Sequence, residues 1–277
     1  MARLTVKNNL DEKKAYGVFS EPELTRNGVV ENHHIILTTN KECGFKCTMC
    51  DLWQNTLDYR VESGVVAGQV QDALDRLSGA SEVLGNSGIS AAKAKHLKIY
   101  NAGSFFDRQS IPKLDTFSIA DELTLRGYET LIVEAHPKLI GTSCFEFAEY
   151  LQPQLEVAMG LETVNEKALK QLEKNMTLDD FKRATESMLS HGIYVRAFIL
   201  LQTPWQNEEE GMHWAKESID FAQSIGVECL TIIPLRKNPR LALPTFTPSS
   251  KEALEEVVMY GLAKNKGRVF GDTWDAV

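Results

Sequence analysis

Three cysteines that lie close together constrain this chain more than any other feature of its sequence. Cys43, Cys47 and Cys50 follow the spacing C-x3-C-x2-C. An iron–sulfur cluster of four irons is normally held by four cysteine thiolates, so a loop that supplies three leaves one iron open to another ligand. Cysteines spaced C-x2-C also hold zinc, and a structural zinc site is the alternative that this spacing leaves open.

The cysteine loop directly follows a segment that we expect to form a buried strand. Residues 35–39 read Ile-Ile-Leu-Thr-Thr, which is apolar and β-branched. The loops that follow the strands of an α/β barrel carry its active site. The sequence therefore predicts that the three thiolates lie at the mouth of such a barrel.

Beyond residue 30 the chain alternates strand-like and helix-like segments, which is typical of a parallel sheet wrapped by helices. Residues 1–30 are polar and mixed, and we expect an N-terminal extension there, followed by one core domain over residues 31–277. The small, polar stretch 79–95 predicts a long loop. The expected strands are 35–39, 97–101, 130–135, 155–160, 195–202 and 229–234, and the expected helices are 64–77, 119–126, 144–151, 178–191, 209–225 and 251–264.

The composition predicts a globular chain without a membrane segment. Of its 277 residues 43% are hydrophobic, and no apolar run approaches the roughly 18 residues that span a bilayer. The net charge is −8, whereas a protein that holds nucleic acid by itself usually carries a basic patch. The N-terminal residues lack the apolar stretch of a signal peptide, so we expect a cytoplasmic protein with reduced thiols. Cys144 and Cys229 are expected in the core, because two cysteines are too few for a second four-iron cluster.

The cysteine loop, placed after a strand at the start of an α/β series, resembles the signature of the radical S-adenosylmethionine (radical SAM) superfamily. Three further runs resemble a subgroup of it that includes the radical subunit of archaeosine synthase and, more distantly, the radical domain of the Elongator acetyltransferase. They are Asn-Ala-Gly-Ser-Phe-Phe-Asp at 101–107, Glu-x-x-Pro at 134–137 and Asp-x-Trp-Asp at 272–275. The resemblance implies an α/β fold, a partial (β/α)6 TIM-like barrel of parallel strands. It also implies a 4Fe-4S cluster on the three cysteines, with S-adenosylmethionine (SAM) at the open iron.

The resemblance further implies which side chains surround SAM. The glycine turn at Gly103 and Ser104 would take the methionine amino group, and Glu134 would bind either that group or a hydrogen-bond donor of the substrate. Glu162 would accept hydrogen bonds from the ribose hydroxyls, and Arg196 would reach the methionine carboxylate. The full set of expected cofactor contacts is Met49, Asn101, Gly103, Ser104, Glu134, Glu162, Arg196 and Leu200.

Polar and aromatic residues near other strand ends and at the C-terminus are expected to meet a substrate. They are His136, Gln202, Trp205, Arg236, Asp272 and Asp275. The residues identify neither that substrate nor a catalytic residue.

Three functional hypotheses remain open from the sequence. In the first, the enzyme cleaves SAM to methionine and a 5′-deoxyadenosyl radical, which abstracts hydrogen from a small-molecule metabolite. In the second, the chain is the radical SAM subunit of a tRNA-modifying system, and a partner protein supplies the contacts to RNA. Both imply a reducing partner such as flavodoxin or ferredoxin. The third is a non-catalytic binding module stabilised by zinc.

Overall fold

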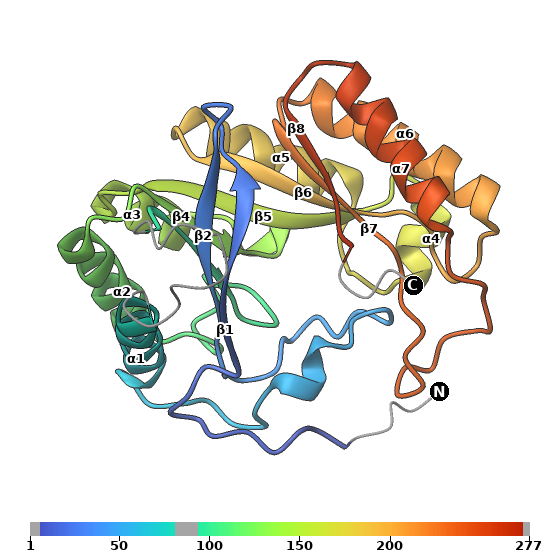
Figure 1. The fold of residues 1–277 in the computed structure, drawn as a ribbon. Coiled ribbons are helices and arrows are strands. Elements are labelled where there is room, and N and C mark those ends of the chain that lie inside the picture. Colours follow the sequence, from blue (N-terminus) through green and yellow to red (C-terminus); the bar gives the residue numbers. More distant parts are fainter. Residues whose placement is uncertain (1–5, 81–93, 274–277) are drawn as a thin grey trace.

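Eight strands form one curved sheet in the computed structural model, which describes residues 6–80 and 94–273 (Figure 1). Along the sheet the strands keep the order that they have in the chain. They are β1 (Gly17–Leu24), β2 (Val30–Leu37), β3 (His96–Tyr100), β4 (Thr130–Glu134), β5 (Gln154–Glu162), β6 (Tyr194–Leu200), β7 (Cys229–Ile233) and β8 (Arg268–Gly271).

The sheet is mostly parallel. β1 pairs with β2 in an antiparallel hairpin, and every later neighbour from β2 to β8 is parallel. Among the described residues no ladder joins β8 back to β1, so the sheet forms an open half-barrel. The predicted α/β, TIM-like partial barrel is confirmed, and all six expected strands are present within a few residues of their expected ends.

Helices cover the outer side of the curved sheet (Figure 1). The α-helices are α1 (Val65–Ala80), α2 (Lys113–Arg126), α3 (Thr142–Tyr150), α4 (Glu166–Gln171), α5 (Leu178–Ser190), α6 (Glu208–Ser224) and α7 (Lys251–Ala263). Two short 3-10 helices, η1 (Leu52–Asn55) and η2 (Pro137–Leu139), lie in the connections after β2 and β4. None of the described helices is long and apolar enough to cross a bilayer.

The best-marked helix of the sequence, α5, shows why these segments are helical. Thr177 and Asp180 form a capping box that satisfies backbone N–H groups at its start. Phe181, Ala184 and Met188 are buried on its inner face, at helical spacing. Alternate residues of the neighbouring β6, such as Val195 and Ala197, belong to the same apolar core. The core therefore lies between the helices and the outer side of the sheet.

The N-terminal segment differs from the expected extension. Residues 17–24 form β1, whose hairpin with β2 runs across residue 30, so this part of the segment belongs to the sheet. Most of the expected loop at 79–95 falls on residues 81–93, outside the described residues. The expectation for the two remaining cysteines is confirmed, since Cys144 in α3 and Cys229 in β7 are both fully buried.

A buried network of charges links strands across the concave side of the sheet. Glu23 in β1 accepts hydrogen bonds from Lys98 in β3 and from Arg196 in β6. Glu156 in β5 bridges Arg196 and Arg268, at 2.7 Å from each. Because a buried charge is costly unless it is paired, this network ties the hairpin strand β1 to the far half of the barrel.

Candidate active site

The three cysteines lie in the loop that follows β2, at the end of the sheet where the parallel strands finish (Figure 1). Each is half-buried. Burial raises the pKa of the Cys50 thiol to about 12, and it also raises the pKa values of Cys43 and Cys47. Backbone N–H groups of Phe45 and Lys46 point at Cys43 and favour its thiolate, which opposes that effect.

This geometry fits a cubane cluster. In a 4Fe-4S cluster each cysteine ligates a different iron, so the thiols need not converge on one point. Cys50 has Cys47 and Cys43 within electrostatic reach, so the three thiols are neighbours. Within residues 6–80 and 94–273, no three His, Cys, Asp or Glu side chains are gathered as ligands of one metal ion.

The turn after β3 places unsatisfied polar atoms beside the cysteine loop. Gly103 lies against Cys43, since a Cβ added at Gly103 would be 3.4 Å from the Cβ of Cys43. The side-chain amide of Asn101 and the hydroxyl of Ser104 are buried, and neither has a hydrogen-bond partner among the described residues. Buried polar groups in proteins nearly always have hydrogen-bond partners, so we expect these atoms to bind a polar ligand.

Glu134 ends β4 next to this turn. Its carboxylate accepts a 3.4 Å hydrogen bond from the backbone N–H of Asn101. Burial raises the pKa of Glu134 to about 7, against the lowering effect of that N–H and of Lys174. Tyr16, which the sequence analysis did not consider, lies within electrostatic reach of both Glu134 and Cys50. Glu134 is thus a carboxyl group that can change charge near neutral pH, next to the unsatisfied turn.

Glu162 ends β5 and is paired with a lysine. Its carboxylate lies 2.6 Å from the ammonium of Lys174, and both side chains are buried. Gly160 makes room for this pair, because a Cβ there would lie 2.0 Å from Glu162 Oε1 and 2.3 Å from Lys174 Nζ. Sequence reasoning missed Lys174, since a lysine in a polar run between two helices looks like a solvated loop residue.

His136 connects the segment that carries Lys174 to the cysteine loop. Its ring stacks on Phe45 at 3.4 Å between centroids, with the planes 8° apart. Nε2 donates to the carbonyl of Lys174 at 2.9 Å, and Nδ1 accepts from the backbone N–H of Lys138 at 3.2 Å. Burial, followed by the charge of Lys174, lowers the pKa of His136 to about 4. Both ring nitrogens therefore have backbone partners, which gives this residue a structural role next to the site.

Left-handed backbone conformations gather in the same loops. Among the described residues six that are not glycine have a positive φ, and five of them lie in the loops of this site or at the end of the strand β5. They are Lys46, Ala102, Glu162, Glu173 and Asn175. Such conformations cost free energy and concentrate at functional sites, where the surrounding structure holds them.

Arg196 is not brought to the cysteine loop. It is the third residue of β6, and its guanidinium is bound by Glu23 and Glu156 in the buried network. Because the side chain is 2% exposed and its N–H groups already have carboxylate partners, its expected contact with SAM does not fit its position. Leu200, at the other end of β6, is buried, and Met49 is half-buried in the cysteine loop.

The other expected substrate residues occupy different places. Gln202 is buried. Its side-chain amide donates a hydrogen bond to the carbonyl of Gln206 and accepts one from the hydroxyl of Ser249, so both ends of the amide are bonded within the protein. Trp205 in this turn is 38% exposed. Arg236 and Asp272, which follow β7 and β8, form a 3.4 Å ion pair. Asp275 lies outside the described residues.

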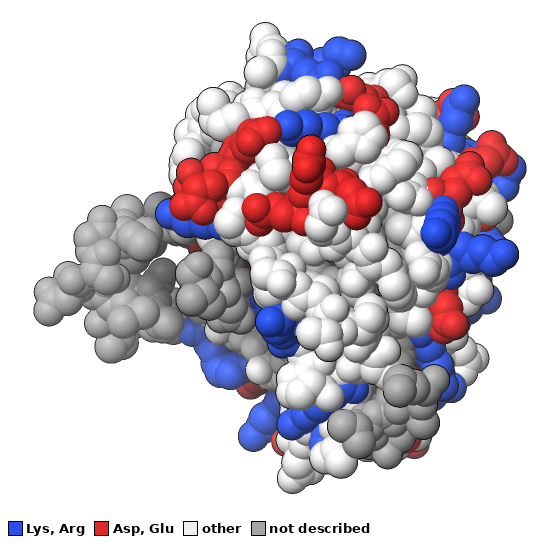
Figure 2. Space-filling model, turned by 90° about the vertical axis from the view of Figure 1, so that its right-hand side faces the viewer, with Lys and Arg blue, Asp and Glu red and all other residues white. Residues whose placement is uncertain are grey.

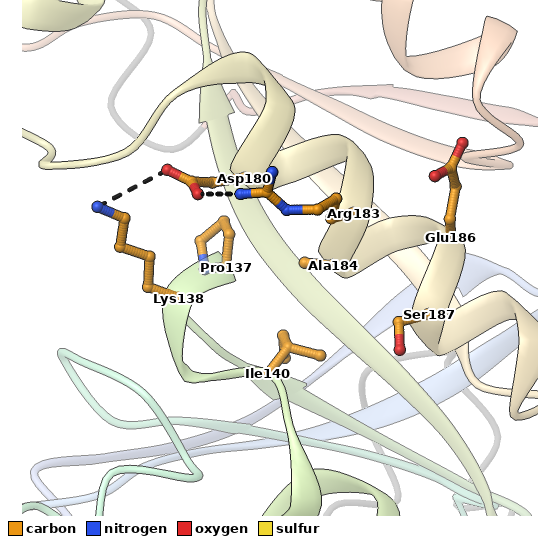
Figure 3. Close-up of a pocket in the computed structure, with 8 residues that line it drawn as sticks. All are labelled: Pro137, Lys138, Ile140, Asp180, Arg183, Ala184, Glu186 and Ser187. Carbon is orange, nitrogen blue, oxygen red and sulfur yellow. Dashed lines mark hydrogen bonds and ion pairs between the residues drawn. The ribbon is translucent and has the colours of Figure 1, made fainter.

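A groove of about 570 Å³ lies on the outer side of η2, between this short helix and α5 (Figure 3). Figure 3 shows Lys138 and Arg183 both directed at Asp180, with distances of 3.7 and 2.7 Å. Lys138 and Arg183 are therefore both paired with a carboxylate that lines the same groove. None of the candidate cofactor residues lines it.

No family model matches the chain, but three curated proteins align with it. An uncharacterised protein of Methanocaldococcus jannaschii is 21% identical over 81% of this chain and 61% of its own length. Archaeosine synthase subunit beta of Thermococcus kodakarensis is 25% identical over 65% of this chain and 53% of its own length. The same subunit of Methanosarcina acetivorans is 28% identical over 46% of this chain and 38% of its own length. The chain thus spans between about two fifths and three fifths of these relatives.

Solved structures share the fold. SuiB of Streptococcus suis superimposes with a TM-score of 0.59 over 86% of this chain and 48% of that one, at 13% identity. Its structure with S-adenosylmethionine bound gives the same TM-score. Coproporphyrinogen III oxidase of Escherichia coli, described as a radical SAM enzyme, gives 0.52 over 85% of this chain and 52% of that one, at 10% identity. The chain thus shares the fold of these two proteins and carries a three-cysteine loop on it, and it is similar in sequence to archaeosine synthase beta subunits.

Proposed function

We propose that the chain holds a 4Fe-4S cluster on Cys43, Cys47 and Cys50, with SAM beside it. When bound, this pair supplies a one-electron cleavage that yields methionine and a 5′-deoxyadenosyl radical, which abstracts a hydrogen atom from the substrate. The observation that carries the proposal is the set of unsatisfied atoms of Asn101 and Ser104, buried next to Cys43. A polar ligand at this place would satisfy them.

The residues around the cysteines have distinct tasks in this proposal. The amide of Asn101, the hydroxyl of Ser104 and the carboxyl of Glu134 bind the amino and carboxylate groups of the methionine part of SAM. Glu162 accepts hydrogen bonds from the two ribose hydroxyls, as carboxylates do in dinucleotide-binding folds. Leu200 and the backbone at Met49 support the adenine. These contacts fix the position of SAM, and position is the main contribution of the protein to such chemistry.

Exclusion of water is the second task of the protein, because a reactive radical would otherwise be lost in side reactions. The ring of Phe45 in the cysteine loop is covered by His136. Trp53 in η1, just beyond the third cysteine, is 5% exposed. We infer that these aromatic side chains shield the cluster from solvent.

Two substrate classes are compatible with this site. A small metabolite is favoured by the net charge of −8, and Figure 2 shows one face on which acidic side chains gather above a broad uncharged area. A tRNA substrate is favoured by the two archaeosine synthase beta subunits among the relatives. As a subunit of a tRNA-modifying system, the chain would depend on a partner protein to bind the RNA. Either reaction needs a reducing partner such as flavodoxin or ferredoxin.

We expect the response to added RNA to separate these two classes. If the substrate is a small metabolite, RNA purified with the protein will be negligible at 50 mM salt, and total tRNA will not change the rate of 5′-deoxyadenosine formation. If it is tRNA, complexes formed with a partner will weaken steeply between 50 and 200 mM salt, because phosphate contacts release counterions. Stimulation of the isolated chain by tRNA would contradict the small-metabolite proposal.

The zinc alternative is tested by the metal itself. Protein purified without oxygen should be brown and contain iron if a cluster is present. A colourless protein with one zinc per chain would support the non-catalytic binding module.

A further inference from the structure

A long connection leads from β7 to α7 and has no task in the proposed function. Residues 234–250 form it, all of them are described, and they contain neither a helix nor a strand. Four of these residues are prolines, which limit the freedom of the chain. Connections longer than about 12–15 residues without secondary structure are uncommon in compact domains and are usually functional. We call residues 234–250 the strap.

The tip of the strap contacts the chain just beyond the third cysteine. The side-chain amide of Asn238 donates a 3.0 Å hydrogen bond to the carboxylate of Asp51, the residue that follows Cys50. The guanidinium of Arg240 donates a 2.7 Å hydrogen bond to the side-chain carbonyl of Gln54 in η1, and Gln54 is buried. The tip is therefore bonded to the segment 51–54 at both of its ends.

The tip is itself held in one shape, which directs Asn238 at the cysteine loop. The side-chain oxygen of Asn238 accepts a 3.0 Å hydrogen bond from the backbone N–H of Arg240. Its backbone carbonyl accepts another from the N–H of Leu241, whose side chain is buried. Because the oxygen of the Asn238 side chain is used within the turn, its NH2 group is left to bind Asp51.

The strap joins two sides of the barrel mouth that lie five strands apart in the sheet, at β2 and β7. Near its start, Arg236 forms the 3.4 Å ion pair with Asp272, which follows β8. Near its end, the hydroxyl of Ser249 donates a 2.6 Å hydrogen bond to Gln202, which follows β6. Figure 1 shows the orange connection after β7 reaching the light-blue segment that contains η1. The cysteine loop is thus tied to the far half of the barrel.

We propose that Asn238 and Arg240 are positioning residues that hold the loop of the third cysteine in place from the opposite side of the mouth. The proposal rests on the proposed function, since it takes Cys50 as a ligand of the cluster. Before Cys50, the backbone N–H of Thr48 donates a 2.9 Å hydrogen bond to the carbonyl of Leu172. Beyond Cys50, the strap adds its two bonds, so the ligand is supported on both sides. Contacts around the ligands of a metal site govern how firmly the metal is held.

The first test is hydrogen exchange of the full chain, with and without a reconstituted cluster, read by mass spectrometry of peptides that cover residues 51–57. Asn238→Asp keeps the size of the side chain and the oxygen that accepts from Arg240, but it places a carboxylate opposite Asp51. The backbone N–H groups of Gln54 and Leu57, which are bonded in this segment, should exchange roughly 2- to 10-fold faster. Arg240→Ala should act in the same direction.

A double variant separates this contact from a general loss of packing. Asn238→Asp/Asp51→Asn exchanges the two side chains, so an amide again faces a carboxylate, and slow exchange should return. A loss of packing alone would not be repaired by this exchange of side chains. Lys237→Ala changes an exposed neighbour in the strap, and as the matched control it should exchange like the wild type.

The second test is the rate at which an iron chelator removes the cluster from reconstituted protein of equal iron content. Asn238→Asp should raise this rate by a similar factor, and the double variant should lower it again. Wild-type rates of exchange and of iron loss in both Asn238→Asp and Arg240→Ala overturn the role of the strap alone. So does faster exchange that leaves the rate of iron loss unchanged. A wild-type protein that binds no cluster overturns the proposed function, and hydrogen exchange of the same protein then still tests the contact of the strap.

Discussion

Replacement of Cys43, Cys47 and Cys50 by alanine is expected to lower the iron content of reconstituted protein from about four per chain to none. In the proposed cluster each of these thiolates would ligate one iron, and within residues 6–80 and 94–273 the remaining cysteines, Cys144 and Cys229, are buried in the core. The measurement is iron and sulfide analysis together with the visible absorption of the cluster.

The control for this prediction is Cys144→Ala, which removes a buried thiol from α3 and should retain about four irons. The small core truncation would lower stability without affecting the cluster. Retention of a cluster by the triple variant would contradict the assignment. So would a count near eight irons in the wild type, because it would require a second cluster.

The second large effect is expected for the carboxylates at the ends of β4 and β5. Glu162→Gln keeps the shape of the side chain but removes the charge that would accept the ribose hydroxyls. Loss of a charge-assisted hydrogen bond costs about 1.5–3 kcal/mol, so SAM should bind roughly 10- to 100-fold more weakly. The iron content should not change. Titration calorimetry with SAM measures the affinity, and Glu166→Gln, an exposed acid in the first turn of α4, is the matched control.

Glu134 adds a dependence on pH to the same measurement. Its raised pKa of about 7 leaves the carboxyl group mostly protonated below that pH and charged above it. If it binds the methionine ammonium, the affinity for SAM will rise as the pH increases through 7, and Glu134→Gln will remove that rise. If it binds the substrate instead, SAM affinity will be unaffected and only coupled turnover will fall. Unchanged binding and turnover in both Glu134→Gln and Glu162→Gln would exclude these acids from the site.

The elements that the sequence predicts best are those with a local signal. Runs such as residues 130–135 are apolar and β-branched, and the helix α5 has its own capping box, so each can be read from its own residues. β1 was missed because it contains Pro22 and two glutamates that serve the charged interior of the barrel. β8 and α4 have four and six residues, which is too short for a periodic pattern.

The residues of the candidate site likewise differ in whether the sequence near them predicts their position. The cysteines and the turn at residues 101–104 could be located because their spacing and their place after a strand are local features. The position of Arg196 was misjudged because it depends on Glu23, a partner 173 residues away in the chain. The position of Lys174 could not be predicted at all, since its ion pair with Glu162 depends on a space left by Gly160 in another element. Contacts of this kind appear only once the chain is folded.

The most direct test of the account is the cleavage of SAM itself. Anaerobically reconstituted protein with dithionite and SAM should form 5′-deoxyadenosine and methionine in equal amounts, measured by liquid chromatography and mass spectrometry. The triple cysteine variant should form neither. A wild-type protein that carries about four irons per chain, binds SAM and still forms no 5′-deoxyadenosine under these conditions would contradict the account.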